Sequence, residues 1–215
     1  MSAVLVLAGP SAVGKTTVMQ EIISKNTRFE YVRSATTRAP RGDGKDAEYI
    51  YLSQERFLSD ISSGKMLEYT EYGGNLYGTP AEEIDRILKM GRIPTLILDI
   101  NGVKSLKSQT GNFDVFAVYI WEDVKILENR LYERMLSDKS SRAEETFKKR
   151  REVNLRDLSS VSDFAYLFDA FIRNTEVENT AKEILLGFSR FTNGIRRDAG
   201  SVENIINQIR ELSSK

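Results

Sequence analysis

The chain of 215 residues contains neither cysteine nor histidine. Without cysteine it can form no disulfides, thiolate nucleophiles or zinc–thiolate sites. Without histidine it has no imidazole base, no histidine-centred catalytic triad and no histidine metal ligand. Its chemistry must therefore depend on lysine, arginine, carboxylates, hydroxyls, main-chain amides or a metal ion that arrives with a substrate.

The sequence also lacks an excess of charge, because 31 basic residues balance 31 acidic ones. A balanced chain produces no long-range field that would attract nucleic acid or an anionic membrane, so we expect neither as a partner. Any anion site must be built locally. The first apolar run, Val4–Ala8, is far shorter than the roughly 18 apolar residues that span a bilayer, and no later run approaches that length. We therefore expect a cytoplasmic protein.

Hydrophobic residues make up 40% of the chain, which is enough for one sizeable core. Short apolar runs predict four buried strands, and apolar residues at intervals of three and four predict helices between and after them. This alternation indicates an α/β fold with a parallel sheet flanked by helices. The expected strands are Val4–Ala8, Thr95–Ile100, Val115–Ile120 and Phe168–Ile172, and the expected helices are Thr16–Lys25, Pro80–Lys89, Asp123–Leu136, Val177–Leu186 and Val202–Leu212.

Two segments interrupt this alternation. Residues from about 31 to 79 are rich in glycine and tyrosine, which predicts a small mixed-β lobe inserted into the core. Residues 144–157 have a helical period but are densely charged and poor in core residues. We expect a single domain over 1–215, with its core in 1–30, 80–125 and 158–190 and a helical tail of unassigned function from about 190 to 215.

The segment GPSAVGKT, Gly9–Thr16, matches the phosphate-loop pattern G-x-x-x-x-G-K-[ST] at every fixed position. It follows an apolar strand and precedes a helix, where main-chain amides and the helix N-terminus can surround a phosphate. Lys15 would reach the β- and γ-phosphates, and the Thr16 hydroxyl would bind Mg²⁺. The expected nucleotide-binding residues of this segment are Gly9, Pro10, Ser11, Ala12, Val13, Gly14, Lys15, Thr16 and Thr17.

Several separated motifs together resemble those of guanylate kinases, over roughly residues 3–188. They are GPSAVGKTT, SATTRAPRGDGKDAEYIYLS, LEYTEYGGNLYGT, RLYER followed by EETFKKR, and FIRNT. The resemblance implies a fold of the P-loop NTPase type, with a GMP-binding lobe at about 31–79 and a lid at about 126–157. It also implies transfer of a phosphoryl group from ATP, bound with Mg²⁺, to GMP.

The resemblance also implies roles for residues of the lobe. A nucleotide phosphate needs donors from several directions, and guanine offers donors at N1 and N2 and an acceptor at O6. By resemblance, Glu68 accepts the guanine donors, and Ser34 and Thr79 donate to O6. Arg38, Arg41, Tyr49 and Tyr77 grip the phosphate of GMP, and Arg41 also neutralises charge during transfer.

For the ATP side, the resemblance assigns Arg134 and Arg150 to the transferring phosphate and Asn174 to the base of ATP. Arg130 lies four residues before Arg134, on the same helix face, and is a further nucleotide-binding candidate. The catalytic set is then Lys15, Arg41, Arg134 and Arg150.

The chain departs from the family pattern in three places. The strand that usually carries V-N-D ends here in Arg173-Asn174-Thr175. Asp99-Ile100-Asn101-Gly102 is about two residues shorter than the family's D-I-D-x-Q-G, and Arg134-Met135-Leu136 lacks the R-G-T with which the lid usually starts. An aspartate that ends a buried strand is a common turn-former. It can also hold Mg²⁺ through water or orient a basic group. Asp99 is counted among the substrate-binding candidates.

Three functions follow from these observations. The first is phosphorylation of GMP, and of dGMP, by a monomer or small homo-oligomer. The second is phosphorylation of another small phosphorylated acceptor, against which Glu68 with Ser34 and Thr79 favours guanine. The third is a catalytically silent binding module of the same fold, against which the intact Gly14-Lys15-Thr16 argues.

Overall fold

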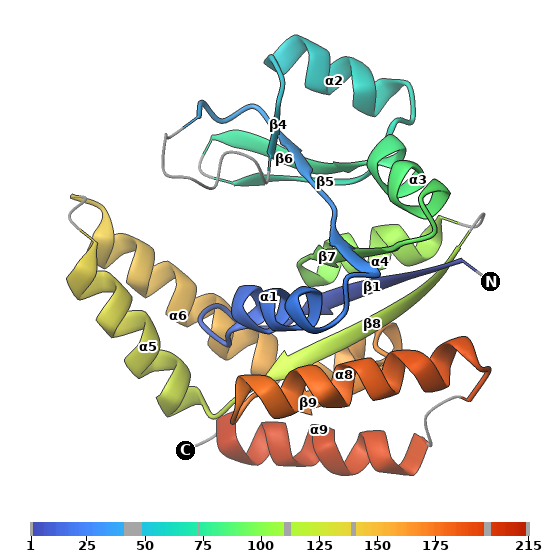
Figure 1. The fold of residues 1–215 in the computed structure, drawn as a ribbon. Coiled ribbons are helices and arrows are strands. Elements are labelled where there is room, and N and C mark those ends of the chain that lie inside the picture. The colour runs from blue at the N-terminus through green and yellow to red at the C-terminus, as the bar shows by residue number, and fades with distance from the viewer. Residues whose placement is uncertain are drawn as a thin grey trace. The chain divides into compact units, whose positions relative to one another are not determined.

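The computed structural model describes residues 2–40, 49–72, 74–109, 113–138, 141–195 and 199–213. These residues form two compact units: one contains residues 1–6 and 23–115, and the other contains 7–22 and 116–215. Figure 1 shows the helices and strands. The described strands form a five-stranded sheet in the order β2-β7-β1-β8-β9 and a four-stranded sheet in the order β4-β3-β6-β5.

The five-stranded sheet confirms the expected α/β fold with a parallel sheet. Strand β2 pairs in parallel with β7, with Phe29 opposite Ile93, and β8 pairs in parallel with β9. The three-residue β2 was not predicted, because its central Glu30 interrupts the apolar pattern. The expected strand Thr95–Ile100 was placed too late, since β7 ends at Ile97. The strands are β1 (Ala3–Ala8), β2 (Phe29–Tyr31), β7 (Ile93–Ile97), β8 (Asp114–Trp121) and β9 (Ala170–Arg173).

The four-stranded sheet lies within the predicted lobe and is mixed, as expected. Strand β3 (Ser34–Thr36) runs parallel to β4 (Tyr49–Tyr51) and antiparallel to β6 (Asn75–Pro80), which pairs antiparallel with β5 (Met66–Tyr72).

The lobe also contains a helix that was not predicted, α2 (Gln54–Ser62). The Ser53 side chain caps it by accepting from the Arg56 amide. Phe57 of this helix is fully buried and packs with Ala35 and Met66 in a small core. A nine-residue helix with one buried aromatic residue has too little apolar periodicity to be predicted from the sequence.

The first unit is completed by α3 (Ala81–Lys89) and α4 (Ile100–Ser108). Glu83 of α3 is buried and is compensated by two guanidinium groups, with the nearest nitrogen of Arg33 at 2.7 Å and that of Arg86 at 3.2 Å. These ion pairs offset the free-energy cost of burying the Glu83 carboxylate.

The helices of the second unit include two that lie side by side, α5 and α6 (Figure 1). A 2.6 Å ion pair between Arg151 of α6 and Glu128 of α5 joins them. The C-terminal α9 packs against α6, α7 and β9. Within the described ranges, no helix is long and apolar enough to cross a membrane. The helices are α1 (Lys15–Lys25, of which 15–22 belong to this unit), α5 (Val124–Ser137), α6 (Ala143–Ser159), α7 (Val161–Phe164), the 3-10 turn η2 (Ala165–Leu167), α8 (Val177–Thr192) and α9 (Ala199–Ser213).

An aromatic cluster forms the centre of the second unit. The ring of Tyr119 lies 5.2–5.6 Å, centroid to centroid, from the rings of Phe164, Phe168 and Phe171. Its hydroxyl is buried and has no hydrogen-bond partner among the residues that the structure describes. Burial and the charge of Asp157 raise the pKa of this hydroxyl, so it stays protonated. The hydroxyl therefore carries a desolvation cost without a compensating bond.

We expect Tyr119→Phe to stabilise the protein by about 1 kcal/mol, which raises Tm by about 2–4 °C for a chain of this size. The ring contacts stay, while the unpaired hydroxyl is removed. Thermal unfolding followed by circular dichroism measures this shift. Tyr166→Phe is the matched control, because Tyr166 is 72% exposed and its substitution should leave Tm unchanged. A lower Tm for Tyr119→Phe would mean that the hydroxyl is bonded in solution.

Candidate active site

The loop between β1 and α1 has the backbone conformation that its glycines allow. Gly9 and Gly14 have φ angles of 136° and 99°, and Ala12 has a φ of 66°. A Cβ on Gly9 would lie 2.0 Å from the carbonyl oxygen of Ile120, so no larger residue fits there. Ala12 is strained, since alanine rarely adopts the left-handed region. The surrounding contacts have to supply the free energy that holds this turn.

Those contacts come from side chains outside the loop. Asn154 of α6 accepts from the Ser11 amide at 2.7 Å and donates to the Ser11 carbonyl at 3.0 Å. The other two carbonyls of the turn accept from Arg130, which reaches Ala12 at 3.4 Å, and from Asn174, which reaches Val13 at 2.7 Å. Three consecutive carbonyls of the loop are thus bonded by side chains.

Lys15 is the first residue of α1, and its ammonium group donates to the carbonyls of Gly9 at 2.7 Å and Pro10 at 2.9 Å. Burial, and after it the charges of Arg134 and Arg150, lower the pKa of Lys15 to about 8, while the charge of Asp157 acts in the opposite direction. The ammonium group therefore lacks a full counter-charge. An anion bound in the loop would supply one, and the pKa would then rise.

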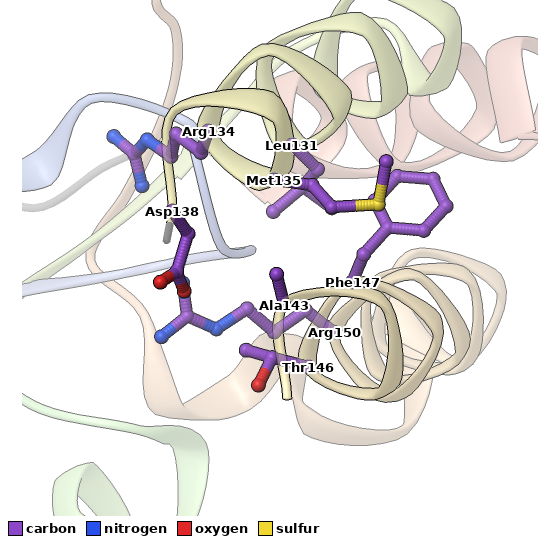
Figure 2. Close-up of a pocket in the computed structure, with 8 residues that line it drawn as sticks. All are labelled: Leu131, Arg134, Met135, Asp138, Ala143, Thr146, Phe147 and Arg150. Carbon is purple, nitrogen blue, oxygen red and sulfur yellow. The ribbon is translucent and has the colours of Figure 1, made fainter. Parts of the chain in front are cut away.

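Arg134 and Arg150 lie at a pocket between α5 and α6 (Figure 2). Their guanidinium groups extend to one side of it, while Met135 and Phe147 line the other. One carboxylate, that of Asp138, also lines this pocket. Together with Lys15 the two arginines concentrate positive charge near the loop, in a chain whose net charge is zero. The closure of these arginines over a phosphate stays a prediction.

Asn174 follows β9 and is only 3% exposed. Its amide nitrogen donates to the Val13 carbonyl, and its oxygen accepts from the Thr180 hydroxyl at 2.9 Å. Most of its hydrogen-bonding capacity is thus used within the protein. The predicted contact of Asn174 with the base of ATP stays a prediction, and the structure adds a second role in holding the phosphate loop.

In the first unit, Glu68 of β5 and Thr79 of β6 face each other across the sheet, and both are buried. The Thr79 hydroxyl donates to Oε1 of Glu68 at 2.6 Å. While this bond persists, its proton is not available to a guanine O6, which leaves Ser34 of the two predicted donors. Burial raises the pKa of Glu68 and the Asp99 charge adds to this, while the Thr79 bond opposes it. A buried carboxylate with spare acceptor capacity suits a ligand that brings donors.

Arg38 lies beside two tyrosines of β4. Its guanidinium carbon is 5.2 Å from the ring centroid of Tyr49, and its Nη2 makes a long 3.5 Å bond to the Tyr51 hydroxyl. Nη1 is buried and has no partner among the described residues. The Tyr77 ring packs edge-on against Tyr49 at 6.3 Å. An unpaired guanidinium donor beside two tyrosines is an arrangement that an anion would complete.

The remaining predicted residues of the lobe are Ser34, Arg41 and Asp99. Ser34 lies opposite Tyr49 in the β3–β4 register. Arg41 lies outside the described residues. Asp99 is exposed, and its Oδ1 accepts from the Gly102 amide at 2.7 Å, so it is the N-cap of α4. This cap is the local role that Asp99 performs, and its substrate contact stays a prediction.

The start of α4, directly after Asp99, lies next to Glu68. A Cβ on Gly102 would lie 3.3 Å both from Oδ1 of Asp99 and from Oε2 of Glu68. The two carboxylates are therefore neighbours, which accounts for the effect of Asp99 on the pKa of Glu68. Within the described ranges, no group of three or more acidic residues could hold a metal ion.

Three residues that contact these sites were not predicted: Tyr51, Asn154 and Thr180. Asn154 stands four residues after Arg150 in the charged helix. Its burial, at 3% exposure, distinguishes it from the charged residues around it, and the sequence does not show this burial. Thr180 follows Asn174 by six residues, in the first turn of α8.

A parallel α/β sheet with a G-x-x-x-x-G-K-T loop between its first strand and first helix defines a P-loop nucleotide-binding protein. The family model described as Guanylate kinase matches residues 1–186. The guanylate kinase of Streptococcus thermophilus strain CNRZ 1066 is 36% identical over 215 residues, which cover 98% of this chain and 97% of that one. The guanylate kinase of Rubrobacter xylanophilus is 30% identical over 182 residues, covering 84% and 90%.

A solved structure agrees with this at the level of the fold. The guanylate kinase from Anaplasma phagocytophilum superimposes with a TM-score of 0.60 and 22% identity, and the match covers 92% of this chain and 88% of that one. The chain belongs to the guanylate kinase family. It is an enzyme of the ATP-dependent kinase class that, in general terms, phosphorylates GMP.

We expect ATP binding to be accompanied by proton uptake at Lys15. Because the pKa is about 8 in the free protein, about half of the Lys15 side chains are neutral at pH 8, and bound phosphate favours the charged form. Titration calorimetry with Mg-ATP in two buffers of different ionisation enthalpy should give an uptake of about half a proton at pH 8 and almost none at pH 6.5.

Lys15→Arg is the control for this measurement, since its guanidinium stays charged throughout the range. Uptake should disappear in that variant. Equal uptake in both proteins would assign the proton to another group.

Proposed function

We propose that the protein transfers the γ-phosphoryl group of Mg-ATP to GMP and to dGMP, giving ADP and the guanine nucleoside diphosphate, in the synthesis and recycling of guanine nucleotides. The observation that carries the choice of acceptor is the buried carboxylate of Glu68 beside Thr79. Thr79 satisfies part of this carboxylate, and a ligand that donates further hydrogen bonds would compensate the rest of its burial.

Selection of guanine follows from the donors and acceptors. Guanine brings an N1–H and an N2 amino group to the Glu68 carboxylate, and Ser34 donates to its O6. Adenine has an acceptor at N1 and no amino group at C2, so beside adenine the carboxylate would keep only its bond from Thr79 and lack a donor for its remaining acceptor sites. Leaving a buried charge unpaired can amount to discrimination of about 10⁴-fold.

The phosphate of GMP is assigned to Arg38, Tyr49, Tyr77 and Arg41. The unpaired Nη1 of Arg38 supports this assignment, because a phosphate oxygen is the partner that it lacks. The acceptor oxygen of GMP is already an anion, so no general base is needed. The arginines instead hold this oxygen in position and reduce the repulsion between the two phosphates.

ATP is assigned to the second unit. The loop amides and Lys15 hold its phosphates, Arg130 and Asn174 bind the nucleotide, and Arg134 and Arg150 neutralise the charge that develops during transfer. Mg²⁺ bound to nucleotide phosphates needs few protein ligands, so the exposed Thr16 hydroxyl at the start of α1 fits it without an acidic cluster. The ion would screen the phosphate oxygens of ATP.

These assignments give each segment of the chain a role. Residues of about 31–79 are the GMP-binding lobe, and those of about 126–157 are a lid that excludes water from the transferring phosphate. We assign the protein to the cytoplasm, as a monomer or small homo-oligomer.

A coupled ADP-release assay with Mg-ATP and each of GMP, dGMP, AMP, UMP and CMP tests this function. We expect turnover with GMP and dGMP alone, and its loss in Lys15→Ala with the far-UV spectrum unchanged. Turnover with only one of the other nucleotides would mean that this nucleotide, and not GMP, is the phosphoryl acceptor. ATP binding without any turnover would favour a silent binding module.

Glu68→Gln should lower kcat/KM for GMP by about a hundredfold, with KM for ATP unchanged, because one acceptor oxygen becomes a donor that opposes the guanine N–H groups. Glu71→Gln is the matched control, since Glu71 is an exposed glutamate of the same strand. Steady-state kinetics with both substrates varied measures the effect. Equal kcat/KM in the two variants would place the guanine pocket elsewhere.

A further inference from the structure

Two hydrogen bonds join one side chain of α6 to one residue of the phosphate loop. Asn154 pairs with both main-chain groups of the same residue, accepting from the Ser11 amide at 2.7 Å and donating to the Ser11 carbonyl at 3.0 Å. Asn154 is 3% exposed, so its end of both bonds is shielded from water, while Ser11 is half-buried. A side-chain amide used in this way acts as a piece of neighbouring main chain, and it fixes the orientation of the residue that it pairs with.

This orientation matters because the peptide unit is planar and trans. When the Ser11 carbonyl points toward Asn154, the amide of Ala12 in the same peptide plane points in the opposite direction. The Ser11 amide, in contrast, is already used by Asn154. The asparagine therefore decides which amides of the loop are available to a phosphate: it withdraws that of Ser11 and presents that of Ala12.

The strained residue of the loop lies at the same peptide. Ala12 has a φ of 66°, a conformation that costs alanine about 1–2 kcal/mol and persists only where its surroundings impose it. The Arg130 bond to the Ala12 carbonyl, at 3.4 Å, is too long to impose it alone. Of the two shorter bonds from Asn154, the one to the Ser11 carbonyl acts on the Ser11–Ala12 peptide, directly before the strained residue, and the one from the Ser11 amide acts on the peptide before that.

The helix that carries Asn154 also carries a proposed catalytic group. Arg150 and Asn154 are separated by four residues and so lie on the same face of α6. Asp157, a further turn along, affects the charge of Lys15. One helix face thus carries a cation proposed for the phosphate, the side chain that orients the loop and an acid that acts on the loop lysine.

We propose that Asn154 is a positioning residue for ATP: it orients the Ser11–Ala12 peptide so that the Ala12 amide faces the bound phosphates, and it fixes α6 to the loop in the same contact. This role rests on the proposed binding of ATP by the loop. It adds a determinant of ATP affinity that lies outside the G-x-x-x-x-G-K-T segment and does not touch the nucleotide.

The test compares Asn154→Ala with Leu158→Ala. Leu158 is 1% exposed on the same helix and forms no hydrogen bond with the loop, so its variant loosens α6 without changing the Ser11 peptide. For Asn154→Ala we expect the Kd and KM for Mg-ATP to rise about tenfold, with KM for GMP unchanged. For Leu158→Ala we expect a lower Tm and little change in ATP affinity.

Amide exchange of Ser11, measured by NMR on the full chain without nucleotide, is the readout that does not depend on activity. We expect Ser11 to exchange slowly in the wild-type protein and in Leu158→Ala, and fast in Asn154→Ala. Unchanged Ser11 exchange together with unchanged ATP affinity in Asn154→Ala would overturn the proposal. Equal losses of ATP affinity in both variants would reduce Asn154 to a structural residue and overturn it as well.

If Asn154→Ala does not fold, Asn154→Asp tests the positioning role of Asn154 instead. Aspartate has the same size and keeps the acceptor for the Ser11 amide, but it replaces the donor by an oxygen that repels the Ser11 carbonyl. We expect slow Ser11 exchange with weakened binding of Mg-ATP, and wild-type ATP affinity would contradict the proposal. Because nucleotide binding is measured directly, absent GMP turnover in the wild-type protein would refute the proposed function without affecting this result.

Discussion

The phosphate loop sets the main constraint on this protein, because it has to hold several negative charges with main-chain amides in a chain of zero net charge. Amides bind anions only when they converge, and convergence requires a turn that ordinary residues resist. Gly9 and Gly14 allow that turn, while Ala12 is held in it against its own preference. The second unit surrounds the loop with groups that stabilise the turn, and only a few of them lie in the loop sequence.

Much of this was predictable where the signal is local. The loop motif, the apolar runs that became β1 and β8, and the periodic helices α1, α3 and α5 are each contained in a short stretch of sequence. The parts that were not predicted depend on partners far along the chain. The bond between Asn154 and Ser11 joins residues 143 positions apart, and a single asparagine in a charged helix has no period that would distinguish it.

Asp99 shows a different kind of limit. Its position after an apolar run fits both a ligand of substrate or metal and a turn-former, and the sequence contains no means of choosing between them. In the structure it caps α4 through the Gly102 amide, and its charge lies next to Glu68. The same aspartate thus caps a helix and raises the pKa of a buried carboxylate. Such coupling becomes visible only when the distances are known.

The two proposed substrate sites use opposite electrostatic designs. Around the loop, burial and the charges of Arg134 and Arg150 lower the pKa of Lys15, so the charged lysine carries a cost that a bound polyanion relieves. Around Glu68, burial and Asp99 make the ionised carboxylate costly until a ligand brings hydrogen-bond donors. Each site lies within one compact unit and is made unfavourable in the absence of its own ligand. Part of the binding free energy in each site therefore comes from stabilising a buried charged group of the protein. A ligand with the complementary charges or hydrogen-bond donors is favoured for this reason over other ligands of similar size.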